Sequence, residues 1–329
     1  MVLHCICLAL SVTLGATLQA LGSSMPSIHG GQAVLPVPVV SWQRPCRRPP
    51  RRADDSLADS TALLATLLQR RGYVALSLQP VVASDTQSRF WVRGSVGTTP
   101  LNLLIDSGAE GTIHIRGADA DALGIRGSPT DSITTVNGKV STDTGRVRQF
   151  TLGTMRFADQ PVIIPRVKNR SNALAITFLS THAAILDYGH AMLYVQLVRQ
   201  NSLPELATWM TQHHYTLIPL GRMKGDTTVV VVRAAVGSAS VLLFLDTGAT
   251  GTVTLDQSCA EKLAVHDRLT LTLGPVRLDA LPFDTYDFSQ LNARLQHRGL
   301  PHVDGVLEAD VLRAHAAILD LGQDMLYLR

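Results

Sequence analysis

Two segments of the chain repeat one another, and each ends an apolar run at an aspartate. The segment 96–115, VGTTPLNLLIDSGAEGTIHI, aligns without a gap on 236–255, VGSASVLLFLDTGATGTVTL, which places Asp106 on Asp246. In each copy a strand-like run leads into Asp-Ser/Thr-Gly-Ala, a pattern typical of a chain that leaves a buried strand and turns sharply. The repeat therefore predicts two related β-rich units, each with a carboxyl group at a turn.

Two such turns brought face to face would form a pair of carboxyl groups. Because two close carboxyls cannot both ionise cheaply, they share a proton, so one can accept a proton from water while the other hydrogen-bonds a carbonyl. We expect the hydroxyls of Ser107 and Thr247 to bond across to the opposite loop, and Gly108 and Gly248 to let the backbones approach. This chemistry needs no metal ion, cofactor or covalent nucleophile. In the alternative interpretation, both motifs are only tight turns of a duplicated β-protein.

The duplication extends beyond the motif, over units of about 130 residues, an ordinary domain size. Three further pairs of segments resemble one another: 60–78 and 202–220, 150–157 and 271–278, and 182–195 and 315–328. The expected domains are a first lobe at 57–197 and a second lobe at 202–329.

Asp-Thr-Gly-Ala after an apolar strand, with a later ILDYG before a short strand, resembles the lobes of aspartic proteases. The lobes are similar to retropepsin-like bacterial aspartyl proteases, here fused in tandem as in pepsin, and the resemblance covers 73–195 and 215–329. It implies an all-β acid-protease fold with short helices, in which two homologous lobes form a pseudo-dimer within a monomer. It further implies hydrolysis of a protein or peptide substrate by an activated water, with Asp106 and Asp246 as the catalytic dyad.

The repeat also predicts a hairpin in the first lobe that the second lobe lacks. The spacing between matched positions shows that the second unit lacks 19 residues of the segment 126–148. That segment contains TTVNGKVS, in which Asn137-Gly138 between β-prone runs is a strong hairpin signal. The family resemblance implies that this hairpin is a flap over the substrate, supplied by the first lobe alone, and the alternative is an ordinary surface hairpin. The second unit instead gains 12 residues around 287–302, and the sequence indicates no function for them.

Two positions depart from the family pattern, which usually has a glycine shortly before the final strand of each lobe. The matching residues are Ala175 and Glu308. A glutamate beneath a carboxylate loop should raise pKa values or force the backbone to move, so we expect a distorted second lobe. Two alternatives to an endopeptidase follow: a peptide-binding protein that lost hydrolysis, and a structural protein built from duplicated β-lobes.

The N-terminal region has its own composition. Residues 1–22 are apolar and end in small residues, which predicts a signal peptide, a periplasmic or secreted protein, and no stable membrane span after cleavage. A non-cleaved anchor, or a true start at Met25 with a cytoplasmic protein, stays open because no Lys or Arg precedes the apolar run. Residues 23–56 form a Pro/Arg-rich segment that is typical of a disordered linker or propeptide.

The remaining features point to no other function. The net charge is +3, but five arginines lie in RPCRRPPRR, so the basic balance belongs to a tail and does not indicate nucleic-acid binding. No Cys/His set has metal-ligand spacing. Cys46 and Cys259 would remain after cleavage, as one disulfide or as two free thiols. Asp187 and Asp320 recur before a glycine, which predicts turn-forming residues.

Overall fold

The sequence repeat reappears as a repeat of secondary structure. The computed structural model describes residues 54–81, 88–135, 138–167, 170–199, 203–223 and 226–329. The signal-peptide prediction, Cys46, Asn137 and nearly all of the Pro/Arg-rich segment lie outside these residues. No helix in the described ranges has the length and apolar content needed to cross a membrane.

The described part of the first half contains a series of strands with three helices. Its helices are α1 (Asp54–Arg70), α2 (Gly117–Ala122) and α3 (Ile176–Thr181), and its strands are β1 (Tyr73–Ser77), β2 (Gln79–Pro80), β3 (Phe90–Val96), β4 (Thr99–Asp106), β5 (Ile113–His114), β6 (Ser128–Thr135), β7 (Gly138–Leu152), β8 (Met155–Pro165), β9 (Ala173–Ala175), β10 (Ile185–Asp187) and β11 (Met192–Gln196).

The second half repeats this order with small changes. Its helices are α4 (Pro204–Gln212), α5 (Gln257–Leu263), α6 (Ser289–His297) and α7 (Ala309–Ala314), and its strands are β12 (Thr216–Pro219), β13 (Gly221–Met223), β14 (Asp226–Val236), β15 (Ala239–Asp246), β16 (Val253–Asp256), β17 (Leu269–Leu273), β18 (Val276–Leu281), β19 (Asp284–Tyr286), β20 (Gly305–Glu308), β21 (Ile318–Asp320) and β22 (Met325–Leu328).

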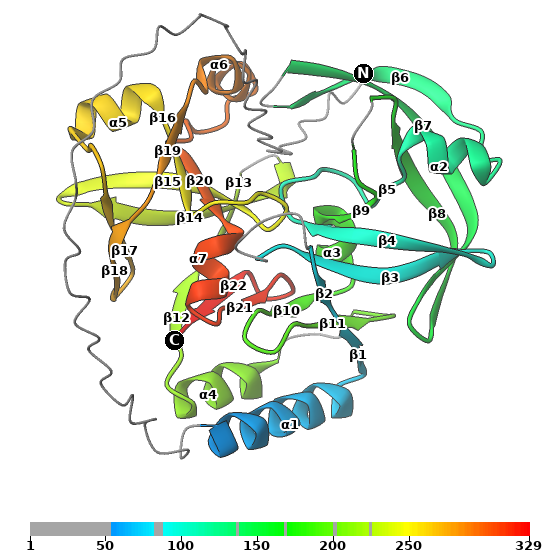
Figure 1. Cartoon of the computed structure of the whole chain (residues 1–329), viewed down its shortest axis with the longest axis horizontal. Helices are drawn as coiled ribbons and strands as arrows, with labels where there is room; N and C mark the ends of the chain where they lie inside the picture. Colours follow the sequence, from blue (N-terminus) through cyan, green and yellow to red (C-terminus); the bar gives the residue numbers. More distant parts are fainter. Residues whose placement is uncertain (1–53, 82–87, 136–137, 168–169, 200–202, 224–225) are drawn as a thin grey trace, which may run out of the picture.

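Each half folds into a lobe around its own curved sheet (Figure 1). The first sheet has the order β2-β3-β4-β9-β5-β8-β7-β6, and the second has the order β18-β17-β14-β15-β20-β16-β19 with β13 on β14. In both, the strand that ends at the motif aspartate pairs in parallel with a short strand, β4 with β9 and β15 with β20. The predicted mainly-β fold of two homologous lobes is therefore confirmed.

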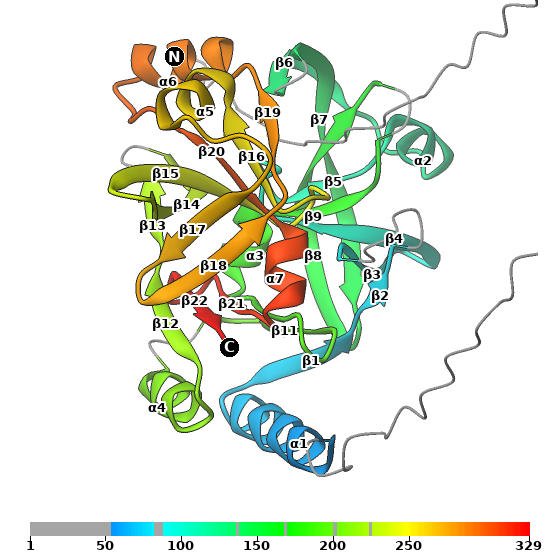
Figure 2. The same ribbon diagram turned by 60° about the vertical axis from the view of Figure 1, so that its left-hand side comes forward.

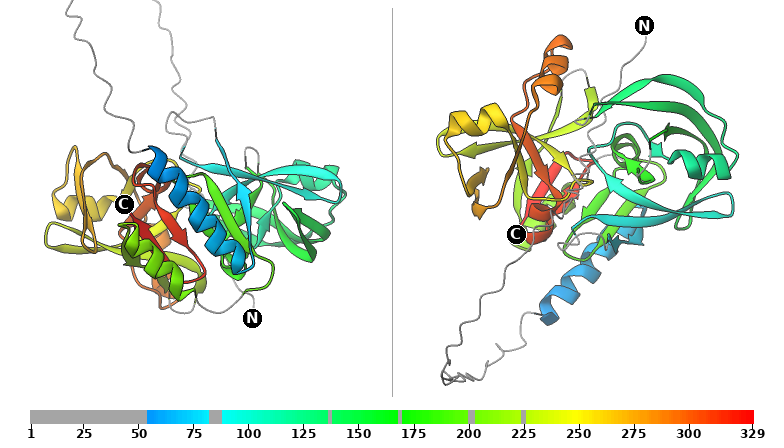
Figure 3. Two further views of the ribbon diagram at one scale, coloured as in Figure 1. Left: turned by 90° about the horizontal axis from the view of Figure 1, so that it is seen from below. Right: turned by 45° about the horizontal axis from the view of Figure 1, so that its top comes forward.

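A third sheet joins the lobes. It has six strands in the order β1-β11-β10-β21-β22-β12, three from each half. At its centre β10 and β21 run antiparallel, with Leu186 opposite Leu319, so the join is symmetric about this pair. Helices α1 and α4 cover one face of the sheet (Figures 2 and 3). Buried side chains of both helices, including Leu68 and Met210, belong to one core cluster with this sheet.

The two length differences between the repeats have separate structural outcomes. In the first lobe, β6 and the start of β7 form a hairpin that closes with Thr135 opposite Gly138. In the second lobe β17 follows α5 after only a short connection. The region around 287–302, where the second unit gains 12 residues, contains α6, whose Leu291 and Leu295 pack with Phe288 into an apolar cluster of that lobe.

The turn residues Asp187 and Asp320 end the two central strands of the shared sheet. The Asp187 carboxylate accepts the His190 amide at 3.0 Å and contacts His190 Nδ1 at 2.8 Å. The second copy has Gln323 where the first has His190, and Asp320 Oδ1 accepts two turn amides at 2.9 Å each. Asp320 Oδ2 is buried without a hydrogen bond from the described residues. Burial raises the pKa of Asp320 to about 7, against the lowering effect of the turn amides.

This buried carboxyl should make stability depend on pH. Because the pKa of Asp320 is higher in the folded chain than in the unfolded chain, its contribution is complete below its ordinary pKa and is lost as pH rises through about 7. Asp320→Asn should therefore reduce the fall in unfolding free energy between pH 4 and pH 7 by up to about 4 kcal/mol. Urea unfolding at several pH values measures this. The exposed Asp267→Asn serves as the control, and equal pH slopes in Asp320→Asn and wild type would contradict the expectation.

Candidate active site

The two motif aspartates lie at the ends of equivalent central strands. The last four residues of β4 and the last six of β15 are buried. Because successive side chains point to opposite faces of a sheet, these consecutive buried residues show that both strands are buried on both faces, which explains the unbroken apolar runs in the sequence. The side chain of Asp106 is 5% exposed and that of Asp246 is fully buried. The fold thus places a carboxyl group at the same point of each lobe.

Each aspartate is held by the turn that follows it. Asp106 Oδ1 accepts the amides of Gly108 at 3.0 Å and Ala109 at 2.9 Å. Asp246 Oδ1 accepts the equivalent amides of Gly248 at 2.8 Å and Ala249 at 3.2 Å. One oxygen of each carboxyl is therefore engaged by backbone, which leaves Oδ2 as the oxygen for other partners.

The loops of the two lobes are bound together by a buried hydrogen-bond lattice. Ser107 Oγ donates to the carbonyl of Leu245 at 2.8 Å, and Thr247 Oγ1 donates to the carbonyl of Ile105 at 3.0 Å. The same hydroxyls accept the opposite amides, Thr247 N to Ser107 Oγ at 3.0 Å and Ser107 N to Thr247 Oγ1 at 2.9 Å. These four bonds bring together the two loops that sequence reasoning singled out.

Gly248 lies directly against the opposite aspartate. A Cβ atom at this position would lie 2.6 Å from Asp106 Oδ1, inside the contact distance of the two atoms. The Asp106 carboxyl therefore reaches the turn that holds Asp246. Only a residue without a side chain leaves room for this approach.

Burial raises the pKa of both carboxyls, but their surroundings differ. For Asp106, the turn amides and the positive charges of Arg170 and Arg89 oppose the effect of burial. For Asp246, burial is followed by the negative charge of Asp106 and, more weakly, of Glu308, both of which raise the pKa further. The pair therefore has one member that ionises more readily than the other.

Arg89 is a site residue that the sequence analysis missed. Its guanidinium Nη1 donates to the Gly248 carbonyl at 3.4 Å, and its charge acts on both motif aspartates and on Asp310. It precedes β3 in the first lobe, and the repeat aligns it with Val229 in the second. A comparison of the two repeats could have flagged this asymmetry, but no local pattern connects Arg89 to the aspartates.

Glu308 does not distort the second lobe, which corrects the expectation from the sequence. Its backbone N–H donates to the Thr252 carbonyl at 3.0 Å, just as Ala175 donates to Thr112 at 2.9 Å in the first lobe. The buried carboxyl accepts a hydrogen bond from Thr254 Oγ1 at 2.7 Å. Burial raises the pKa of Glu308 to about 7. Its charge also raises the pKa of Asp246, after the larger effects of burial and of Asp106, in the direction expected from the sequence.

The β7 strand of the β6–β7 hairpin packs against the loop that follows Asp106. Val140 of β7 forms a small buried cluster with Ala109 of that loop and Ala175 of β9. Thr142, two residues further along β7, is also buried and pairs with Pro165 of β8. The strand next to the hairpin tip is therefore part of the lobe, and Gly138 lies at the turn end of β7.

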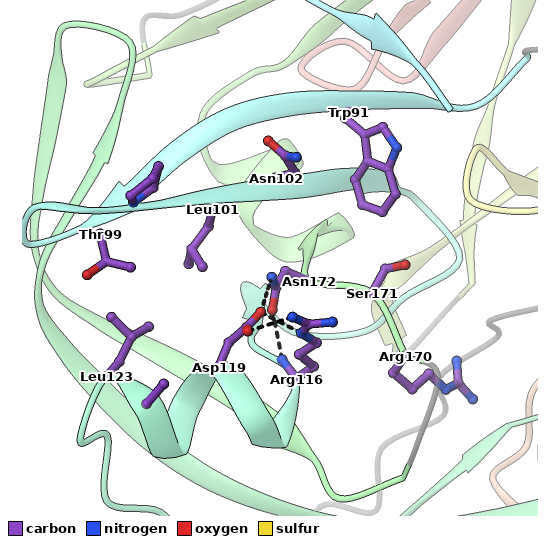
Figure 4. A pocket seen from close by; sticks show the side chains of 12 residues that line it. Trp91, Thr99, Leu101, Asn102, Arg116, Asp119, Leu123, Arg170, Ser171 and Asn172 are labelled. Carbon is purple, nitrogen blue, oxygen red and sulfur yellow. Dashed lines mark hydrogen bonds and ion pairs between the residues drawn. The ribbon is translucent and has the colours of Figure 1, made fainter. Parts of the chain in front are cut away.

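A separate pocket of about 560 Å³ lies between the β3–β4 hairpin and α2 (Figure 4). Arg116 forms an ion pair with Asp119 at 2.7 Å, and the Asn172 amide donates to the same carboxylate. Trp91 and Arg170 also line this pocket, away from the Arg116–Asp119 ion pair. Neither motif aspartate lines this pocket, so it is distinct from the carboxyl pair.

Comparisons with known proteins agree with the sequence resemblance to aspartic proteases. Residues 92–177 match the family model described as aspartyl protease, a range that includes the Asp106 loop, the hairpin and Ala175. Among solved structures, a retropepsin-like aspartic protease from Rickettsia conorii is similar at 17% sequence identity, with 38% of this chain and 98% of that chain covered and a TM-score of 0.31. No curated protein matches the chain.

The cross-lobe lattice should contribute strongly to stability. Thr247→Val keeps the side-chain shape but removes the hydroxyl, which leaves the Ser107 amide and the Ile105 carbonyl without this buried partner. The expected cost is about 2–4 kcal/mol of unfolding free energy, because two buried groups lose a bond. Thr270→Val, which removes an exposed 3.3 Å contact with Asp279, is the matched control and should cost little. Equal urea midpoints for the two variants would contradict the role of the lattice.

Proposed function

We propose that this chain is an aspartic-type endopeptidase that hydrolyses peptide bonds with a water activated by Asp106 and Asp246. The observation that carries the proposal is the buried lattice, because it binds two carboxyl-bearing turns from different lobes into one unit. The family match over the first lobe supports it independently.

The geometry suits general acid–base chemistry. Oδ1 of each aspartate is held by turn amides, and the buried Asp246 Oδ2 has no hydrogen-bond partner among the described residues. We propose that the Oδ2 oxygens bind the attacking water. The ionised carboxyl accepts a proton as the water attacks the peptide carbonyl, and the protonated carboxyl donates to the carbonyl oxygen. Collapse of the tetrahedral adduct then returns a proton to the leaving amine.

One chain would provide the complete site. We propose a first lobe at 57–197 and a second lobe at 202–329, each of which supplies half of the acid–base device. The lattice and the shared six-stranded sheet are both intramolecular, which favours a working monomer. A protein or peptide in extended form is the substrate class that the proposal implies.

The alternative is a peptide-binding protein that has lost hydrolysis, and Glu308 is the feature that favours it. Against it, the second lobe keeps the backbone hydrogen bond beneath its aspartate turn, and the Asp246 turn amides bond the carboxyl as in the first lobe. Cleavage of an unfolded protein by the wild-type chain separates the two functions.

Replacement of either aspartate should abolish cleavage. Asp106→Asn and Asp246→Asn should each lower kcat/KM by at least about 10²-fold, because each removes half of one acid–base device. The double variant should be no worse than either single one, since the two residues act as a unit. Cleavage of an unfolded protein between pH 3 and pH 8 measures this, with near-UV circular dichroism to check folding and Asp267→Asn as a surface control.

Substantial activity in a freshly purified, folded single variant would contradict the assignment of Asp106 and Asp246 as the catalytic dyad. If the wild-type chain binds a statine-type peptide but cleaves nothing across this pH range, the peptide-binding alternative is correct.

The tip of the β6–β7 hairpin should act as a flap over the substrate. Because Ile133 pairs with Val140, residues 134–139 can be replaced by a two-residue Asn-Gly turn without removal of the buried Val140 and Thr142. The shortened variant should raise KM and lower kcat, since a flap excludes water and holds substrate, while its thermal midpoint stays close to wild type. Unchanged cleavage kinetics would show that the hairpin is only a surface feature.

A further inference from the structure

We propose that Glu308 is a positioning residue that fixes Asp246 as the proton-holding member of the pair, which leaves Asp106 as the base. This inference rests on the proposed function, because it assigns the two roles within the same site. It reverses the expectation that glutamate at this position is a defect.

Strand register places Glu308 beside one aspartate only. The parallel pair β15–β20 sets Asp246 opposite Glu308, whereas the equivalent pair β4–β9 sets Asp106 opposite Ala175. The second lobe therefore carries a third carboxyl group where the first lobe carries a methyl group. The two aspartates are equivalent in backbone geometry but not in charge.

The Glu308 carboxyl is held in one place. Its side chain is 3% exposed, and Oε1 accepts a hydrogen bond from Thr254 Oγ1 at 2.7 Å. Oε2 lies against Gly251, where an added Cβ would collide with it. Gly251 also has φ +136°, a conformation that side chains disfavour, so this position suits glycine for two reasons. The surroundings are thus shaped to accept the glutamate.

The charges that act on Glu308 from the neighbouring elements are carboxylates. They are Asp284 of β19 and Asp310 of α7, and both raise its pKa in addition to the larger effect of burial, while the Thr254 hydrogen bond lowers it. With its pKa near 7, Glu308 becomes negative as pH rises through neutrality. Its field then adds to that of Asp106 and raises the pKa of the buried Asp246.

The opposite charge acts on the other aspartate. The guanidinium of Arg89 interacts most strongly with Asp106, then with Asp246, and Arg170 adds a second cation near Asp106. Tyr188 is buried near Asp246. Burial, and to a smaller extent the negative charge of Asp246, raises the pKa of Tyr188, so its hydroxyl stays protonated. Cations near Asp106 and a carboxylate beneath Asp246 therefore act in the same direction, and the shared proton stays on Asp246.

The consequence is activity that extends to higher pH. Cleavage needs one proton on the pair, so it ends when Asp246 loses its proton. An ionised Glu308 makes that loss harder. Without it, the alkaline limb of the pH–rate profile should move to lower pH.

The experiment compares kcat/KM from pH 3 to pH 9 in the full chain with Glu308→Gln, which retains size and the Thr254 contact, and with Glu308→Ala, which copies Ala175. Asp267→Asn removes one surface charge from the same lobe as a matched control. In parallel, ¹³C NMR of carboxyl-labelled aspartate follows the titration of Asp246, with its resonance assigned by its loss in Asp246→Asn.

Both Glu308 variants should shift the alkaline limb and the Asp246 titration about one pH unit lower, with the acid limb and the Asp267→Asn profile unchanged. An unshifted titration overturns the proposal, as does an equal loss of kcat/KM at every pH, which would indicate a structural role only. If the wild type cleaves nothing but the Asp246 titration shifts, the proposed function fails and the role of Glu308 in proton placement stands.

Discussion

The structure depends on two hydroxyl groups that are buried between the lobes. Ser107 and Thr247 each donate to a carbonyl of the opposite strand and accept an amide of the opposite loop. A hydroxyl removed from water needs partners for its proton and its lone pairs, and here the other lobe supplies them. The lobes cannot separate at this point without breaking four buried hydrogen bonds, so the carboxyl groups one residue earlier in each chain segment are held close together.

The shared six-stranded sheet is the second constraint. It pairs the lobes through β10 and β21, with Leu186 opposite Leu319, while α1 and α4 bury apolar side chains against it. Two separate joins leave the lobes little freedom to rotate about either one. The differences between the repeats, the β6–β7 hairpin and α6, lie outside both joins, where an insertion changes neither the lattice nor the sheet.

Sequence reasoning reached the parts of this site that are local and repeated. The alignment of Asp106 on Asp246 located the paired turns, and the length difference located the hairpin. It missed Arg89, because the approach of that side chain to Gly248, 159 residues away in the chain, depends on how the two lobes pack. It misjudged Glu308, because the space beside Gly251 and the hydrogen bond from Thr254 come from β16 and the loop that precedes it. Burial and cross-lobe contact are tertiary properties, and no single segment encodes them.

The fusion of both lobes in one chain permits an asymmetry that a symmetric dimer cannot have. Two identical subunits would place the same residue beside both aspartates, so any charge that favoured a proton on one would favour it equally on the other. Here the repeats differ at the two positions that matter most: Arg89 aligns with Val229, and Glu308 aligns with Ala175. The backbone hydrogen bonds of the turns stay equivalent while the surrounding charge does not. A duplicated chain can therefore divide the acid and base roles through substitutions near the turns, without any change to the lattice that holds the turns together.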